Sequence, residues 1–190
     1  MSAATLLAMQ RPVLATDGFN TFWGLARPPT SYGAYAGDNK DAAKYAFEYP
    51  AGWKVETVGK NEKGMQGIDS RVRNVKNKGQ SAYLVTFGRA GEDNKKFKLG
   101  DIEQTLQGFA GADYDLQDAL TESTDKKSTT REVDGQTFYD YELCGPANNY
   151  LATVTLKEGK VYAFFVKSPA KSYSGDESTL RSIVQSFRTV

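Results

Sequence analysis

Residues 127–143 read KSTTREVDGQTFYDYEL, and this stretch decides the fold class. Two strand-like runs, Lys127 to Val133 and Thr137 to Leu143, flank the dipeptide Asp134-Gly135. Asp-Gly between two such runs is the commonest signal of a two-residue β-hairpin. A second hairpin is predicted where residues 151–156 and 161–166 flank the KEGK turn at 157–160. The C-terminal half is therefore predicted to contain two antiparallel hairpins.

Helical patterns lie on both sides of these hairpins. Residues 101–109 have apolar side chains at helical spacing, and Asp101 is placed as the N-cap or first-turn acid. A shorter amphipathic piece covers residues 114–120, and a final helix is predicted over 178–187, capped by Asp176 or Ser178. Hairpins between a middle helix and a final helix predict the α+β class, with a mostly antiparallel sheet sandwiched between helices.

Further strands are predicted before the middle helix. Residues 45–49 alternate at period two and stop at the Pro-Ala-Gly turn at 50–52. Residues 67–73 predict a strand with a weak inner face, as at a sheet edge, and residues 81–87 predict a stronger strand. These strands extend the antiparallel sheet toward the N-terminus.

Composition excludes several function classes. The chain has 190 residues, 24 Lys plus Arg, 23 Asp plus Glu, a formal net charge of +1, one Cys and no His. This length suits one globular domain. The lack of His excludes Ser-His and Cys-His catalytic relays and the commonest zinc, copper and haem ligation. A charge near zero provides no global field for nucleic acid or an anionic membrane. Neither an enzyme of the familiar kinds nor a nucleic-acid-binding protein is expected.

Candidate chemical motifs are few. The sequence has no glycine-rich phosphate loop, CxxC, GxSxG or HExxH motif. Asp113, Asp115 and Asp118 lack the glycine and closing glutamate of an EF-hand, so a solvated acidic loop is expected there, with weak calcium binding as the alternative. Cys144 is expected to be a small buried residue, because no His can activate it. We therefore expect no catalytic residues, no metal site and no cofactor.

Composition changes near Gly37. Residues 1–37 carry only three charges among many aromatic, Gly and Pro residues, whereas residues 38–190 have the pattern of a folded domain. The apolar run at 6–9 is interrupted by Arg11 and Pro12 and is too short to span a bilayer. An extended aromatic arm is predicted, with a short helical turn or irregular clamp around residues 19–25. The arm either folds back on its own domain or docks on a partner; its candidate docking residues are Phe19, Phe22, Trp23, Arg27, Tyr32 and Tyr35.

Charges are segregated along the chain. Residues 101–125 contain seven acids and no base, and residues 60–78 contain six bases and two acids. Such segregation suits docking in a fixed orientation on a complementary protein surface, although ordinary surface charge is an equal alternative. The basic stretch has no aromatic residues for base stacking, which argues against RNA. Candidate partner-binding residues in it are Lys60, Lys63, Arg71 and Arg73.

The order of motifs resembles the PsbP family of extrinsic photosystem II proteins and their PsbP-domain relatives. The matching stretches are YAFEYPAGWK at 45–54, VTFG at 85–88 followed by a helix with Ile102 and Leu106, VDGQTFY at 133–139, KEGKVY at 157–162 and IVQSF at 183–187. The resemblance covers residues 44–190. It implies an antiparallel sheet sandwiched between helices, in agreement with the α+β prediction.

The resemblance also implies a function. It implies a non-enzymatic protein of the chloroplast thylakoid lumen, peripheral to the membrane, that binds photosystem core subunits and other extrinsic proteins. Photosystem II is the expected complex, with an indirect role in calcium and chloride retention at the partner's manganese cluster. A lumenal assembly factor and an extrinsic subunit of photosystem I are the alternatives. The family's metal-binding histidines have no counterpart in a chain without His.

Overall fold

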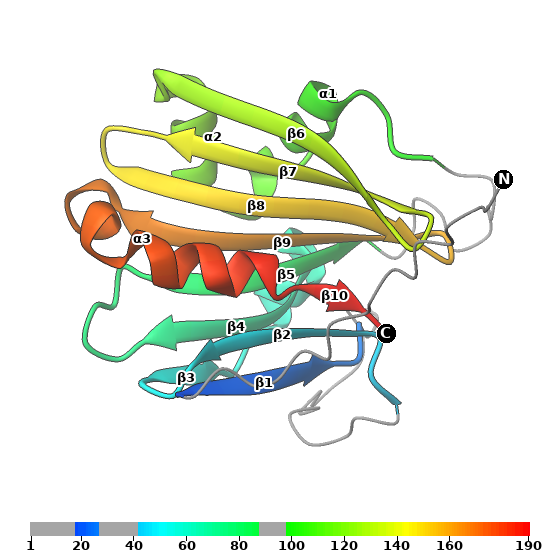
Figure 1. Ribbon diagram of the computed structural model, residues 1–190, viewed down its shortest axis with the longest axis horizontal. Helices are drawn as coiled ribbons and strands as arrows, with labels where there is room; N and C mark the ends of the chain where they lie inside the picture. The colour runs from blue at the N-terminus through cyan, green and yellow to red at the C-terminus, as the bar shows by residue number, and fades with distance from the viewer. Residues whose placement is uncertain (1–17, 27–41, 88–97) are drawn as a thin grey trace, which may run out of the picture.

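Two antiparallel sheets form the framework of the molecule (Figure 1). The computed structural model describes residues 18–26, 42–87 and 98–190. The larger sheet has seven strands, and all of its neighbouring strands pair antiparallel. In spatial order these strands are β3 (Trp53–Glu56), β4 (Ile68–Asn74), β5 (Ser81–Phe87), β9 (Lys160–Pro169), β8 (Asn148–Lys157), β7 (Gln136–Cys144) and β6 (Asp125–Val133).

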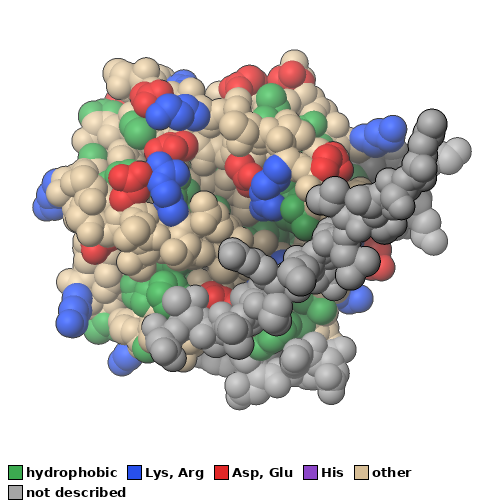
Figure 2. Space-filling view, viewed as in Figure 1, with side chains coloured by type: hydrophobic (Ala, Val, Ile, Leu, Met, Phe, Trp, Pro, Cys, Tyr) green, Lys and Arg blue, Asp and Glu red, His purple; other side chains and the backbone are tan. Residues whose placement is uncertain are grey.

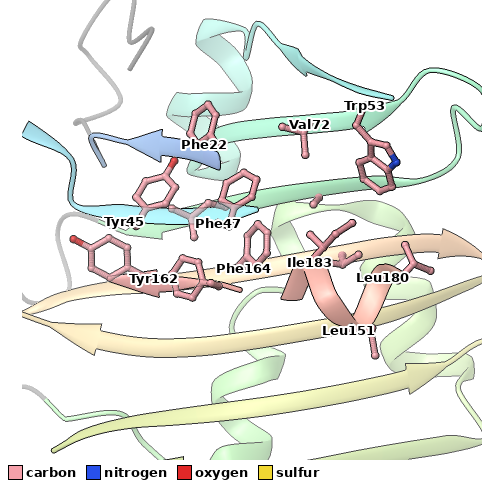
Figure 3. Packing of buried hydrophobic residues seen from close by; sticks show 14 of the residues in the cluster. Phe22, Tyr45, Phe47, Trp53, Val72, Leu151, Tyr162, Phe164, Leu180 and Ile183 are labelled. Carbon is pink, nitrogen blue, oxygen red and sulfur yellow. The ribbon is translucent and has the colours of Figure 1, made fainter. Parts of the chain in front are cut away.

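One face of the large sheet is covered by a helix and a small second sheet. The helix is α3 (Ala170–Gln185), and the three-stranded sheet has the order β1 (Phe19–Gly24), β2 (Tyr45–Pro50), β10 (Arg188–Thr189). Figure 1 shows α3 crossing in front of the large sheet. Aromatic rings fill the space between these layers; Phe47 of β2 meets Phe164 of β9 with centroids 4.5 Å apart (Figure 3). This face therefore holds the first of two hydrophobic cores.

The opposite face is covered by short helices. These are α1 (Ile102–Gln107), the 3-10 turn η3 (Ala110–Ala112) and α2 (Tyr114–Glu122). Leu106, Leu116 and Leu120 pack from this layer into a second core with Tyr83 and Phe165 of the sheet. The central strands β8 and β9 are buried on both faces, as their continuous apolar runs indicate. The α+β sandwich is confirmed, with the small sheet as an additional covering element.

Both predicted hairpins are present. Asp134 and Gly135 have φ of 51° and 75°, and Glu158 and Gly159 have φ of 51° and 77°. Positive φ at both central residues defines the type I′ turn, whose twist matches that of the flanking strands. The middle helices are also confirmed: the Asp101 side chain accepts hydrogen bonds from the backbone amides of Glu103 and Gln104 and so caps α1.

The final helix begins earlier than the sequence predicts. It starts at Ala170, with Pro169 at its N-cap, so neither Asp176 nor Ser178 is the cap. Asp176 instead accepts a hydrogen bond from the buried Gln80 side chain, with Nε2 and Oδ2 2.7 Å apart. The first turns of α3 are polar and contain Gly175, and Tyr173 is their buried apolar side chain. The hydrophobic periodicity is therefore too weak there to indicate a helix.

Strand β4 is not an edge strand. It lies between β3 and β5, and the four-residue β3 forms the edge. Ser70 and Val72 of β4 are buried on the side of the first core, whereas Ile68 precedes a register shift in the β4–β5 pairing and packs in the second core. Ser70 reads as a polar interruption in the sequence, but its hydroxyl accepts a hydrogen bond from Tyr45 at 2.6 Å. Because its buried hydroxyl is hydrogen-bonded, Ser70 is tolerated on this face beside Val72.

Candidate functional site

Three of the predicted arm residues lie in strand β1. This strand pairs along its whole length with β2, so the helical turn or clamp predicted around residues 19–25 is wrong. Phe22 is only 5% exposed and packs in the core, whereas Phe19 and Trp23 are half-buried. The guanidinium of Arg188 lies over the Trp23 ring, 5.5 Å from its centroid. For residues 19–24 the fold-back alternative therefore holds; Arg27, Tyr32 and Tyr35 lie outside the described residues.

The predicted basic residues on β4 are paired with carboxylates. Arg71 forms ion pairs with Glu56 and Glu62, with N–O distances of 2.7 and 2.8 Å. Arg73 pairs with the same Glu56 at 2.6 Å and donates to the carbonyl of Lys78. Lys60 is exposed and Lys63 half-buried at the π-helical turn η2 (Glu62–Gln66). The two arginines of the basic stretch are therefore neutralised by carboxylates in the folded protein.

The two glutamates are held in the ionised form. Partial burial raises the pKa of Glu56, but hydrogen bonds from Arg73 and Arg71 outweigh burial and leave the pKa below its ordinary value. The pKa of Glu62 is lowered in the same way: burial acts against the hydrogen bonds from the Gly59 amide and Arg71, which prevail. Four charged side chains thus form one network across β3, β4 and η2.

A second polar cluster lies beside this network and was not predicted. Asp113, the N-cap of α2, accepts hydrogen bonds from the hydroxyls of Tyr83 and Tyr150 on one oxygen, at 3.2 and 3.1 Å. Lys167 of β9 forms ion pairs with Asp115 and, at 3.7 Å, with Asp113. Burial, together with the Asp113 charge, raises the pKa of Tyr83 well above its ordinary value. Both tyrosines therefore stay protonated and donate to the carboxylate.

A pocket of about 220 Å³ joins the two networks. Its floor includes Arg71, Tyr83, Asp113 and Lys167, and its rim includes Gln66 of η2 and Tyr114 of α2. Two large apolar side chains are strongly exposed here: Tyr114, which lines the pocket, is 82% exposed, and Met65, the chain neighbour of the lining residue Gln66, is 83% exposed. The elements that carry them are neighbours, since η2 contacts η3, which leads directly into α2. The structure thus places two exposed apolar side chains from distant sequence regions on neighbouring elements.

The molecular face that carries α3 has a different arrangement of charged side chains. There Lys and Arg side chains lie beside Asp and Glu (Figure 2). Arg181 of α3 pairs with Glu142 and Glu177 at 2.6 and 2.7 Å, and Arg131 pairs with Asp140 at 2.6 Å. All of these side chains except Glu177 line a second pocket of about 290 Å³. Paired charges of both signs provide solubility and give this face no single-sign field.

The described residues show no arrangement typical of a catalytic centre. Cys144 is half-buried, and burial followed by the charges of Glu142 and Asp125 raises its pKa, which disfavours the nucleophilic thiolate. Within residues 18–26, 42–87 and 98–190, no three Cys, Asp or Glu side chains cluster as metal ligands. Asp113 and Asp115 are engaged by tyrosines and Lys167, as described above. In the same part of the chain, no helix is long and apolar enough to cross a membrane.

Comparison with known proteins agrees with the fold. The PsbP family model matches residues 34–189, and a solved structure with the same fold is the solution structure of the cyanobacterial PsbP protein CyanoP from Synechocystis sp. PCC 6803. That structure aligns with a TM-score of 0.62 and 18% identity over 96% of this chain and 99% of its own. The antiparallel sandwich is thus a PsbP-type fold, and the chain belongs to the PsbP family.

Two plant proteins are similar over nearly the whole chain. The thylakoid lumenal 19 kDa protein of Arabidopsis thaliana is 34% identical over 99% of this chain and 83% of its own length. PsbP-like protein 1 of the same plant, which is chloroplastic, is 27% identical over 94% of this chain and 78% of its own length. These similarities assign the chain to the chloroplast thylakoid lumen.

Proposed function

We propose that the protein is a non-enzymatic extrinsic subunit on the lumenal face of photosystem II. The observation that carries this proposal is the similarity to a lumenal PsbP-type protein over 99% of the chain. The polar clusters of the described residues also support it. Their acidic and basic side chains form ion pairs with one another, and none of them is arranged as an activated nucleophile or a general base. The partners are core membrane subunits and other extrinsic proteins, and the protein remains peripheral to the membrane.

The protein on this proposal carries no cofactor of its own. Its contribution to oxygen evolution is indirect: by covering the lumenal surface it helps retain the calcium and chloride that the partner's manganese cluster needs. The formally balanced charge suits such a covering role, since the domain meets a protein surface rather than a polyanion.

Quantitative copurification tests the proposal. Photosystem II and photosystem I complexes and photosystem II assembly intermediates are purified separately, and the chain is quantified in each by mass spectrometry. Near-stoichiometric amounts in mature photosystem II are expected. Enrichment in assembly intermediates with loss from mature complexes would identify an assembly factor instead, and recovery with photosystem I would identify a subunit of that complex.

A further inference from the structure

Met65 and Tyr114 stand out among the apolar side chains of the described residues. Both expose more than four-fifths of their surface, whereas the other exposed large hydrophobics, Val75, Val133 and Val190, expose about half. A large apolar side chain held in water has an unfavourable hydration free energy that burial against a partner would recover. Aromatic residues and methionine are also enriched in the buried centres of protein interfaces.

The local backbone holds both anchors in place. Met65 lies on a π-helical turn that ends at Gly67, whose φ of 71° lies in the left-handed region. Such turns are rare and are frequent at functional sites. Tyr114 is the first residue of α2, directly after the Asp113 side chain that caps the helix and accepts from two buried tyrosines. Tyr114 therefore lies on a helix anchored to the sheet through Asp113, and Met65 lies on a turn tied to β4 by the Glu62–Arg71 ion pair.

In two ion pairs at the pocket the carboxylate is more exposed than its cation. The Arg71 side chain is 18% exposed and its partner Glu62 34%, while the Lys167 side chain is 15% exposed and its partner Asp115 47%. In these two pairs solvent meets the carboxylate first, whereas Arg73, which also lines the pocket, is 33% exposed and its partner Glu56 32%. The acidic character continues along α2, where Asp118 and Glu122 are exposed, and residues 101–125 contain no base. Lys63 of η2, which is half-buried, is the basic side chain closest to Met65 in sequence.

We propose that this Met65–Tyr114 surface binds a segment of a partner protein that presents a lysine or arginine beside an apolar side chain. The apolar side chain packs between Met65 and Tyr114, and the cation meets the Asp115 and α2 carboxylates. This inference rests on the proposed function, for which it names the docking surface and the chemistry of the partner. The charge complementarity sets the orientation, and the two apolar anchors provide most of the affinity.

Site-specific photocrosslinking tests the surface. The full chain carries p-benzoylphenylalanine in place of Met65 or Tyr114 and is incubated with opened thylakoid membranes washed free of soluble lumenal proteins. The control position is Val133, which is 41% exposed on β6, at the opposite edge of the large sheet from β3. Crosslinked peptides are identified by mass spectrometry. We expect both anchors to crosslink to one partner segment that contains Lys or Arg, and the control not to.

Two charge variants in the Tyr114 crosslinking background test the partner's chemistry. Asp118→Lys reverses an exposed acid of α2, and Lys171→Glu reverses an exposed base on the opposite face of the sheet in α3. We expect Asp118→Lys to lower the crosslink yield about threefold or more and Lys171→Glu to leave it unchanged. If both variants changed the crosslink yield equally, the proposal that the partner segment is cationic would be overturned.

The outcomes separate this inference from the proposed function. A basic segment of a photosystem II subunit supports both. A basic segment of a protein outside the photosystems supports the surface and overturns the proposed partner. If the chain copurifies with photosystem II but the anchors crosslink no more than Val133, or crosslink to an acidic segment, the surface is wrong and the function stands. If the chain neither sediments with the membranes nor crosslinks above the control, both are wrong.

Discussion

Phe22 of β1 stacks on Phe47 of β2, with ring centroids 5.1 Å apart and ring planes 24° apart. Through this contact a segment only 20 residues from the N-terminus becomes part of the main hydrophobic core (Figure 3). The strand pairing of β1 with β2 and the burial of Phe22 mean that the domain needs this segment to fold stably.

Truncation of this ring is therefore expected to destabilise the domain. Phe22→Ala should lower the free energy of unfolding by about 3–5 kcal/mol, because it removes a buried aromatic side chain and leaves a cavity. Asn20→Ala, at an exposed position of the same strand, is the matched control and should change stability by less than about 0.5 kcal/mol. Urea unfolding followed by tryptophan fluorescence measures both. A Phe22→Ala variant as stable as the control would show that β1 is not part of the core.

The Arg71 network makes stability depend on pH. Glu56 and Glu62 have folded-state pKa values below their ordinary values. At low pH the unfolded chain therefore binds more protons than the folded protein, and stability falls as pH drops from about 5 toward about 3. The double variant Glu56→Gln, Glu62→Gln should be less stable than the wild type at neutral pH and lose less stability over this range. Urea unfolding at several pH values checks this, and parallel pH profiles for the two proteins would contradict it.

Asp113 connects the helical layer to the sheet. Asp113→Ala removes the cap of α2 and leaves the hydroxyls of Tyr83 and Tyr150 without their acceptor, so a loss of about 2–4 kcal/mol is expected. Asp118→Ala removes an exposed acid of the same helix and should cost less than about 0.5 kcal/mol. Thermal unfolding followed by circular dichroism compares the two. Equal melting temperatures would mean that the Tyr83–Asp113–Tyr150 contacts do not stabilise the fold.

Cys144 is expected to react slowly. Its raised pKa lowers the thiolate fraction near neutral pH, and the thiolate is the form that iodoacetamide alkylates. Half-burial slows the reaction further. Alkylation at pH 8, followed by mass spectrometry, should therefore be several-fold slower for the folded protein than for the chain in denaturant. A folded-state rate equal to or above the unfolded rate would indicate an activated thiol and reopen the question of catalysis.

Sequence patterns predict the elements whose signals are local. The hairpins are recognised because Asp134-Gly135 and Glu158-Gly159 specify positive φ at both turn positions. The start of α1 is recognised because Asp101 caps it within three residues. In each case the decisive interaction lies within a few residues of the pattern that indicates it.

The elements that the sequence misses depend on distant partners. Residues 19–24 form a strand only because β2 lies beside them, and the first turns of α3 gain stability from contacts such as Gln80 with Asp176, 96 residues apart. The intrinsic helix or strand propensity of a segment does not indicate such pairing, because tertiary contacts override local propensity.

The candidate site was predictable only in part. The bases Arg71 and Arg73 stand out in the sequence, but their partner Glu56 is identified by the β3–β4 register, which the sequence does not specify. Tyr83 and Tyr150 lie 30 and 37 residues from Asp113 in the sequence, and no local pattern indicates that their hydroxyls donate to its carboxylate. Met65 did leave one, since it is an isolated large apolar residue in the polar run 59–67, whereas Tyr114 lies between the apolar residues Ala112 and Leu116. Such isolation typifies an exposed position.

Reconstitution tests the central claim most directly. Photosystem II particles stripped of their extrinsic proteins are titrated with the full chain, and binding is measured by cosedimentation together with oxygen evolution at low calcium and chloride. The account predicts saturable binding at about one copy per core, a rise in oxygen evolution, and about tenfold weaker binding for Met65→Ala, Tyr114→Ala than for the control Val133→Ala. Failure of the wild-type chain to bind saturably, with oxygen evolution unchanged, would contradict it.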